Sequence, residues 1–187
     1  MALTKYKLGK LIVPSEEKND DNIYSVDDVK GVSIRKAFIE TKANMSGVSL
    51  TPYLIVKPDY FAYVPVTSRN GNKITIAHND TTNTYIVSSS YIVFHVDKFN
   101  VLDSDFLFMF YNRPEFDRYS RFHSWGSARE VFSWDEMCAT EIELPSIEIQ
   151  KKYVAVFKAL LANNNSTDSV SEICPILIKG AIEEGSR

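Results

Sequence analysis

The sequence predicts an α+β protein, made of a mainly β globule with short helices and a long C-terminal amphipathic helix. Two observations predict this class. Between residues 23 and 96 the chain has six short runs of β-branched and aromatic residues, each bounded by Pro, Asn, Asp, Gly or Ser, which is typical of strands joined by turns. After Pro145, apolar residues recur at spacings of three and four, which is typical of one face of a helix.

The six strand-like runs are expected to form the body of the protein. They are Val32–Ile34, Tyr53–Val56, Phe61–Val64, Lys73–Ala77, Tyr85–Val87 and Tyr91–Val96. Asn70 and Gly71 lie between the third and the fourth run and give the strongest turn signal, because both residue types accept the positive φ angles of a tight hairpin. With 187 residues, of which 44% are hydrophobic, the chain can bury a real core.

Helical patterns follow these runs. The segment Asp103–Arg113 begins with capping residues, continues with a dense apolar run and ends before Pro114. A short piece over residues 115–122 comes next. The longest helix is expected to start at the cap Ser146 and to end near Asn163.

The segment after the long helix is harder to assign. Residues 170–182 are apolar but contain Pro175 and Gly180, so we expect a short terminal element there. We therefore divide the chain into a β-rich domain, residues 1–144, and residues 145–187, which hold the long helix and a short terminal segment.

Composition restricts the class of protein. Cys138 and Cys174 match no metal-ligand spacing and predict a reduced intracellular protein without disulfides. No signal peptide or membrane span is visible, so we expect a cytoplasmic protein with no membrane partner. The net charge of −3 is uneven: residues 1–129 carry 16 basic and 14 acidic residues, whereas residues 130–187 carry 5 and 10. This distribution permits a local basic patch but does not predict one.

The familiar catalytic signatures are missing from the sequence. It has no Gly-rich phosphate loop, no dinucleotide fingerprint, no Gly-x-Ser-x-Gly elbow and no His-Glu-x-x-His. Its three histidines, His78, His95 and His123, do not stand at metal-ligand spacings. We therefore expect no catalytic residue, no metal and no cofactor.

A segment with four arginines interleaved with aromatic residues, 113–129, is the best candidate for a nucleic-acid contact. Arginine neutralises phosphates and bonds guanine edges, and tyrosine and histidine add further hydrogen bonds. The hairpin tip around Asn70 offers a second basic, amide-rich projection. The candidate DNA-binding residues are Arg69, Asn70, Lys73, Arg118, Tyr119, Arg121, His123 and Arg129. In the plainer interpretation, Glu115 and Asp117 pair with the arginines on an ordinary surface.

Several segments share their order with a known family. They are Tyr6–Ile12, Val29–Ile34, Tyr53–Lys57 with Phe61–Tyr63, Ile86–Tyr91, Gly126–Arg129 with Ser133 and Trp134, and Leu144–Gln150. The most specific part is Gly-Ser-Ala-Arg, some 15 to 18 residues ahead of the Leu-Pro-x4-Gln entry to the long helix. In this order the segments resemble the target recognition domain of the DNA specificity subunit of type I restriction-modification systems.

The resemblance implies a mainly β globule that reads one half of a bipartite DNA sequence, and a conserved helix that serves as spacer and docking surface. In such systems the modification subunit methylates adenine and the restriction subunit cleaves DNA, so double-stranded DNA and these two subunits are the expected partners of a non-catalytic chain. A full specificity subunit has two recognition domains, so this chain resembles one half. Its helix is then expected to bind a partner subunit or a second copy, in a homodimer, through Ile149, Tyr153, Val156, Phe157 and Leu160.

Other interpretations stay open from the sequence. The chain is alternatively a small DNA-acting nuclease, or a protein-interaction module that docks a partner through its C-terminal helix without binding DNA. The apolar face of the helix also suits a plain intramolecular core, which leaves a monomer. Arg129 belongs to the shared Gly-Ser-Ala-Arg pattern, and a structural role for it also stays open.

Overall fold

The computed structural model describes residues 3–68, 73–163 and 170–186, and it confirms the α+β class. The strands are β1 (Thr4–Lys7), β2 (Ile12–Ser15), β3 (Lys30–Val32), β4 (Phe38–Glu40), β5 (Leu54–Val56), β6 (Phe61–Tyr63), β7 (Ile76–His78), β8 (Tyr85–Val87), β9 (Ile92–Val96) and β10 (Glu141–Leu144). Each of the six predicted runs overlaps one of them, β3 or β5 to β9.

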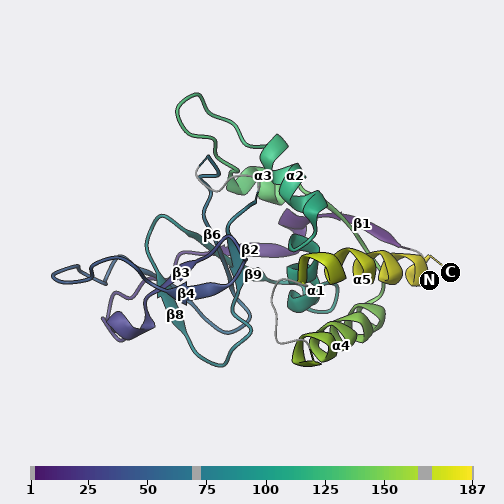
Figure 1. Ribbon diagram of the computed structural model, residues 1–187, viewed down its shortest axis with the longest axis horizontal. Coiled ribbons are helices and arrows are strands. Elements are labelled where there is room, and N and C mark those ends of the chain that lie inside the picture. Colours follow the sequence, from purple (N-terminus) through teal and green to yellow (C-terminus); the bar gives the residue numbers. More distant parts are fainter. Residues whose placement is uncertain (1–2, 69–72, 164–169, 187) are drawn as a thin grey trace.

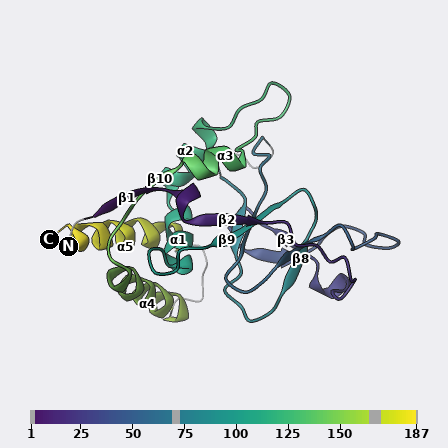
Figure 2. The same ribbon diagram turned by 180° about the vertical axis from the view of Figure 1, so that it is seen from behind.

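The strands form one central sheet and three small pairs, and the strand pairings are antiparallel. The central sheet has the order β2-β9-β6-β7, and the pairs are β1 with β10, β3 with β4 and β5 with β8. In Figure 1, β3, β4 and β8 lie at one end of the molecule and the C-terminal helices at the other. Seen from behind, β1 and β10 run beside the last helix (Figure 2).

Five α-helices and two short 3-10 turns complete the described fold. They are α1 (Ser104–Tyr111), α2 (Pro114–Phe122), α3 (Trp134–Ala139), α4 (Ile147–Asn163), α5 (Val170–Gly185), η1 (Leu8–Lys10) and η2 (Val26–Asp28). The predicted helices α1, α2 and α4 are confirmed. Within the described residues, no helix is long and apolar enough to cross a bilayer.

Helix α1 lies at the centre of the main core. Asp103 caps it by accepting a hydrogen bond from the Phe106 backbone N–H, at 3.1 Å. Tyr111, at its other end, is fully buried and packs edge-on against Phe61 and Phe94 of the central sheet. Because α1 is apolar on most sides, it is covered by the sheet on one side and by α4 and α5 on another.

The short terminal element expected over residues 170–182 needs correction, because α5 is a helix of 16 residues. Pro175 stands early in the helix, where its missing N–H removes one hydrogen bond without preventing the later turns. Gly180 is required by packing: a Cβ there would lie 3.0 Å from Cε1 of Tyr153 in α4. Neither residue therefore prevents the helix: Pro175 is tolerated near its start, and Gly180 allows α5 to pack closely on α4.

Helices α4 and α5 belong to the same core as the β body. Phe157 of α4 and Ile178 of α5 are buried in one cluster with Phe61 and Leu107. Gln150, which is fully buried, fixes the start of α4 by hydrogen bonds. Its side-chain oxygen accepts from the Asp103 N–H, and its side-chain nitrogen donates to the backbone carbonyls of Val101, before α1, and of Pro145, before α4. The division at residue 144 therefore cuts a shared core, and as a functional boundary it stays a prediction.

Candidate nucleic-acid interface

Helix α2 has one buried face and one exposed face, and its sequence explains both. Pro114 occupies the first helical position, where its fixed φ suits a helix start. Phe116 and Ser120 point inward and are buried, whereas Arg118 and Arg121 are exposed on the outer side. Residues three apart on a helix lie on the same face, so the two arginines share one exposed region, as the sequence predicts.

The exposed arginines of α2 take part in ion pairs at the surface. Arg118 lies 3.2 Å from Glu115, and Arg121 lies 2.6 Å from Glu130. Exposed pairs of this kind contribute about 0 to 1 kcal/mol, because water and salt screen them. A phosphate group can therefore replace either carboxylate at little cost in folding free energy.

The other predicted residues of this segment lie beside α2. The ring of Tyr119 is 4.2 Å from that of His123, and the His123 Nδ1 atom lies 3.2 Å from a carboxylate oxygen of Glu136. Arg129 is exposed in the segment between α2 and α3, and within the described ranges it makes no ion pair. That segment projects away from the body of the protein (Figure 1).

The structure brings the flanks of the predicted hairpin against this segment. On one flank, Thr67 N–H donates to the Glu130 carbonyl and Phe132 N–H to the Pro65 carbonyl, each at 2.9 Å. On the other, the Ile74 N–H donates to Asp117 Oδ1 at 3.1 Å. Lys73 is therefore held next to the arginine segment. The remaining two predicted hairpin residues, Arg69 and Asn70, lie outside the described residues.

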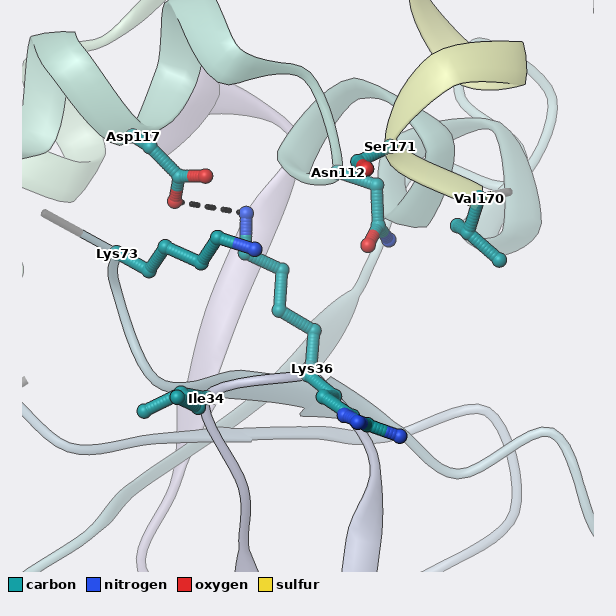
Figure 3. Close-up of a pocket in the computed structure, with 8 residues that line it drawn as sticks. Ile34, Lys36, Lys73, Asn112, Asp117, Val170 and Ser171 are labelled. Carbon is teal, nitrogen blue, oxygen red and sulfur yellow. Dashed lines mark ion pairs between the residues drawn. The ribbon is translucent and has the colours of Figure 1, made fainter. Parts of the chain in front are cut away.

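Asp117 does not serve as a surface partner of the arginines. It is buried on the inner side of α2, where its carboxylate lies 2.8 Å from the ammonium group of Lys36. Figure 3 shows this pair, with Lys73 extending toward the same point from the hairpin flank. The Lys36 ammonium also donates to the Tyr111 carbonyl at 2.6 Å. One carboxylate thus connects α2, the turn between β3 and β4, and the hairpin flank.

Burial controls the charge of this inner site. The pKa of Lys36 is lowered, chiefly because burial removes water from its ammonium, although Asp117 favours the charged form. The hollow beside the pair measures about 80 Å³, which suits a few waters and not a nucleotide cofactor. No local pattern in the sequence marks this pair, since Lys36 stands in a different part of the chain from α2.

Arg113 is the one arginine of the segment that turns inward. Its guanidinium lies 4.2 Å from the centre of the Phe110 ring, and its Nε–H donates to the Phe110 carbonyl at 3.2 Å. Burial lowers its pKa. Arg113 therefore stabilises the junction of α1 and α2, in contrast to Arg118, Arg121 and Arg129 on the outside.

The predicted partner face of α4 is covered to a large extent by the chain itself. Phe157 is buried, and Ile149 and Tyr153 pack against the main core. Tyr153 is held by α5, where its hydroxyl donates to Glu184 at 3.2 Å. Val156, with 43% of its surface exposed, and the half-buried Leu160 are the predicted residues that face outward most.

The chain matches the family model described as the type I restriction modification DNA specificity domain over residues 5–172, and it belongs to that family. A search of curated proteins gave no significant match.

Two solved structures share the fold. One is the crystal structure of the HsdS subunit from Thermoanaerobacter tengcongensis, with 17% identity and a TM-score of 0.59, covering 87% of this chain and 43% of that chain. The other comes from work on complex assembly and conformational transition of the type I R-M system, with 10% identity and a TM-score of 0.50, covering 100% of this chain and 46% of that chain. The present chain thus spans less than half the length of either.

Proposed function

We propose that this chain reads part of a double-stranded DNA target for a type I restriction-modification system and performs no reaction of its own. Family membership supports the class of function. The observation that supports the site is the joining of the described hairpin flanks, residues 65–68 and 73–74, to the separate segment 113–132. In this arrangement phosphate contacts set the position on the duplex and a few polar side chains select the bases.

The exposed side chains of this surface have the chemistry that the proposal needs. Arg121 and Arg118 are held by weak, replaceable ion pairs, and Arg129 is exposed without an ion-pair partner in the described part of the chain. Lys73 is also exposed, although its side chain extends toward the Lys36–Asp117 pair (Figure 3). Guanidinium groups bind phosphate and the guanine edge with two parallel hydrogen bonds. The surface therefore suits an anionic duplex once Glu115 and Glu130 are displaced.

We further propose that the modification and restriction subunits are the protein partners, and that they dock on the outer side of the α4 and α5 pair. Val156 of α4 and Ile176 of α5 are large apolar residues exposed there. A homodimer through α4 has less apolar surface available than the sequence suggests, because Phe157 and Tyr153 are used within the chain. The hetero-complex is for this reason the preferred assembly.

A methylation experiment tests the function. The full chain is added to the modification subunit of its system, a methyl donor and genomic DNA, and the product is sequenced for methylated adenine. Methylation confined to one sequence context is expected. Methylation without sequence preference, or none from a modification subunit that is active with another specificity subunit, contradicts the proposal.

A binding experiment tests the surface. Affinity for a duplex is measured at several salt concentrations, and each lost phosphate contact lowers the slope of log affinity against log salt by about 0.9. We expect this change for Arg121→Ala and for Arg129→Ala. Lys179→Ala is the matched control, because Lys179 is exposed on α5 and pairs with Glu183 in the same manner, 3.8 Å apart. Equal slopes for all three variants contradict the assignment.

A further inference from the structure

Two large aromatic side chains are exposed at the end of α2, beside the proposed DNA surface. Phe122 exposes 74% of its surface and Trp125 exposes 61%. Single exposed apolar residues are common in proteins and need no explanation. Two of them within four residues, on a segment that already presents arginines to solvent, form a distinct apolar feature of this surface.

The Trp125 backbone is held firmly. It exchanges two hydrogen bonds with Val131, at 3.1 and 2.9 Å, and Val131 in turn bridges to Val66 on the hairpin flank. The next residue, Gly126, has a φ of 134°, and a Cβ there would come within 2.2 Å of the Arg129 carbonyl oxygen. The chain thus reverses tightly just after Trp125, and the indole stands on a hydrogen-bonded support and not on a loose tip.

The charges around the two rings point to the ligand. Arg121 directly precedes Phe122 and Arg129 follows Trp125 by four residues, and all four side chains are exposed, so arginines flank the two rings along the chain. The Glu130 carboxylate close to them is already bound to Arg121 in a replaceable pair. A duplex has the matching arrangement, with charged phosphates on the outside, thymine methyl groups on the base edges in the groove, and base steps between which apolar side chains can insert. An apolar protein surface does not match the flanking guanidiniums.

We infer that Phe122 and Trp125 contact the bases of the bound duplex and supply the apolar part of its recognition, while Arg121 and Arg129 hold the phosphates. This inference rests on the proposed function. It separates two kinds of contribution. Loss of an arginine lowers both the affinity and the salt slope, whereas loss of an aromatic ring lowers the affinity and leaves the salt slope unchanged, because no phosphate contact is removed.

The test uses the full chain and a duplex selected by the wild-type protein from a pool with a randomised centre. Stacking of an aromatic ring on a base is worth about 5- to 150-fold in affinity in complexes with single-stranded nucleic acid, and we expect a loss within this range for Phe122→Ala and for Trp125→Ala. Phe99→Ala is the control, because Phe99 is a similarly exposed aromatic residue, at 62%, in another part of the fold. It lies two residues before Val101, whose carbonyl accepts a hydrogen bond from Gln150 of α4. It should bind like the wild type.

A second measurement reports on the indole directly. The chain has two tryptophans, and Trp134→Phe leaves Trp125 as the sole one. Quenching of its fluorescence by acrylamide is expected to fall when the selected duplex is added. Both substituted aromatic residues are exposed, so circular dichroism should show wild-type folding for Phe122→Ala and Trp125→Ala.

The outcomes separate the two proposals. If the wild type binds no duplex, the proposed function and this inference fall together. If Arg121→Ala weakens binding while Phe122→Ala and Trp125→Ala bind like the wild type and acrylamide quenching of Trp125 is unchanged, the inference alone is overturned. If the aromatic variants instead lose only the modification subunit, the two rings form a protein contact and the inference is likewise overturned.

Discussion

The buried pair of Lys36 and Asp117 allows a quantitative test of the fold that supports the DNA surface. Lys36 exposes 4% of its side chain and Asp117 12%, and the two charged groups are 2.8 Å apart. Removing one member of such a pair leaves an unpaired buried charge and costs about 3 to 5 kcal/mol. We expect this loss in the free energy of unfolding for Lys36→Met. Asp117→Asn should lose about 3 kcal/mol, because the amide oxygen still accepts from the Ile74 N–H.

The double variant distinguishes a coupled pair from two independent defects. Lys36→Met with Asp117→Asn contains no unpaired charge, so its loss should fall short of the sum of the single losses by about 3 kcal/mol. Lys36 has a φ of 60°, which strains the backbone of any residue with a side chain. Both variants that carry Lys36→Met have the same strain, so its free energy cancels when the losses of the single and double variants are compared. Urea unfolding followed by circular dichroism measures all four proteins. Losses that add to within about 0.5 kcal/mol would refute the reasoning.

Three further predictions concern the same framework. Gln150→Leu removes the hydrogen-bond partner of the Asp103 N–H and of the Val101 carbonyl before α1, and of the Pro145 carbonyl before α4. It should lower the free energy of unfolding by about 3 kcal/mol, measured by urea unfolding. Gly126→Ala should weaken duplex binding, because the new Cβ would meet the Arg129 carbonyl and distort the turn. The melting temperature should change little, since the turn lies in a projecting segment outside the core. A normal affinity would show that this turn does not shape the surface. Folding lowers the pKa of Lys36 below its ordinary value of 10.5. At a pH between the pKa of the folded state and 10.5, the unfolded chain therefore binds more protons than the folded chain. The stability of the wild type relative to Lys36→Met should for this reason rise as the pH approaches 10.5.

The sequence predicted those elements whose signal is local. The strands β5, β6 and β9 are dense in β-branched and aromatic residues, and α4 has a regular apolar face. Strand β10 was missed although its burial alternates, because four residues with two glutamates give too short a pattern. Local sequence does not predict the full length of α5, because Pro175 and Gly180 are typical helix breakers. Gly180 in fact makes room for Tyr153, a contact that exists only in the folded chain.

In the candidate site, too, the sequence predicts the local properties and not the long-range contacts. The exposure of Arg118 and Arg121 followed from their spacing on a helix, which is a local property. The inward turn of Arg113 and the burial of Asp117 did not, because both depend on partners that the fold supplies. Lys36 reaches Asp117 from a turn far away in the sequence, and no periodicity or motif marks such a pair. Which residues contact DNA stays a prediction until the binding experiments are done.

The main-chain character of the bonds between residues 65–67 and 125–132 has a consequence for how such a domain changes its target. These bonds use amide and carbonyl groups that every residue except proline can supply in full, so they place few demands on side-chain identity. Side chains on the outer side are then free to be exchanged while the platform beneath them is kept. Libraries randomised at the outward positions of this platform, with Asp117 and Gly126 held fixed, should yield folded proteins that read new sequences.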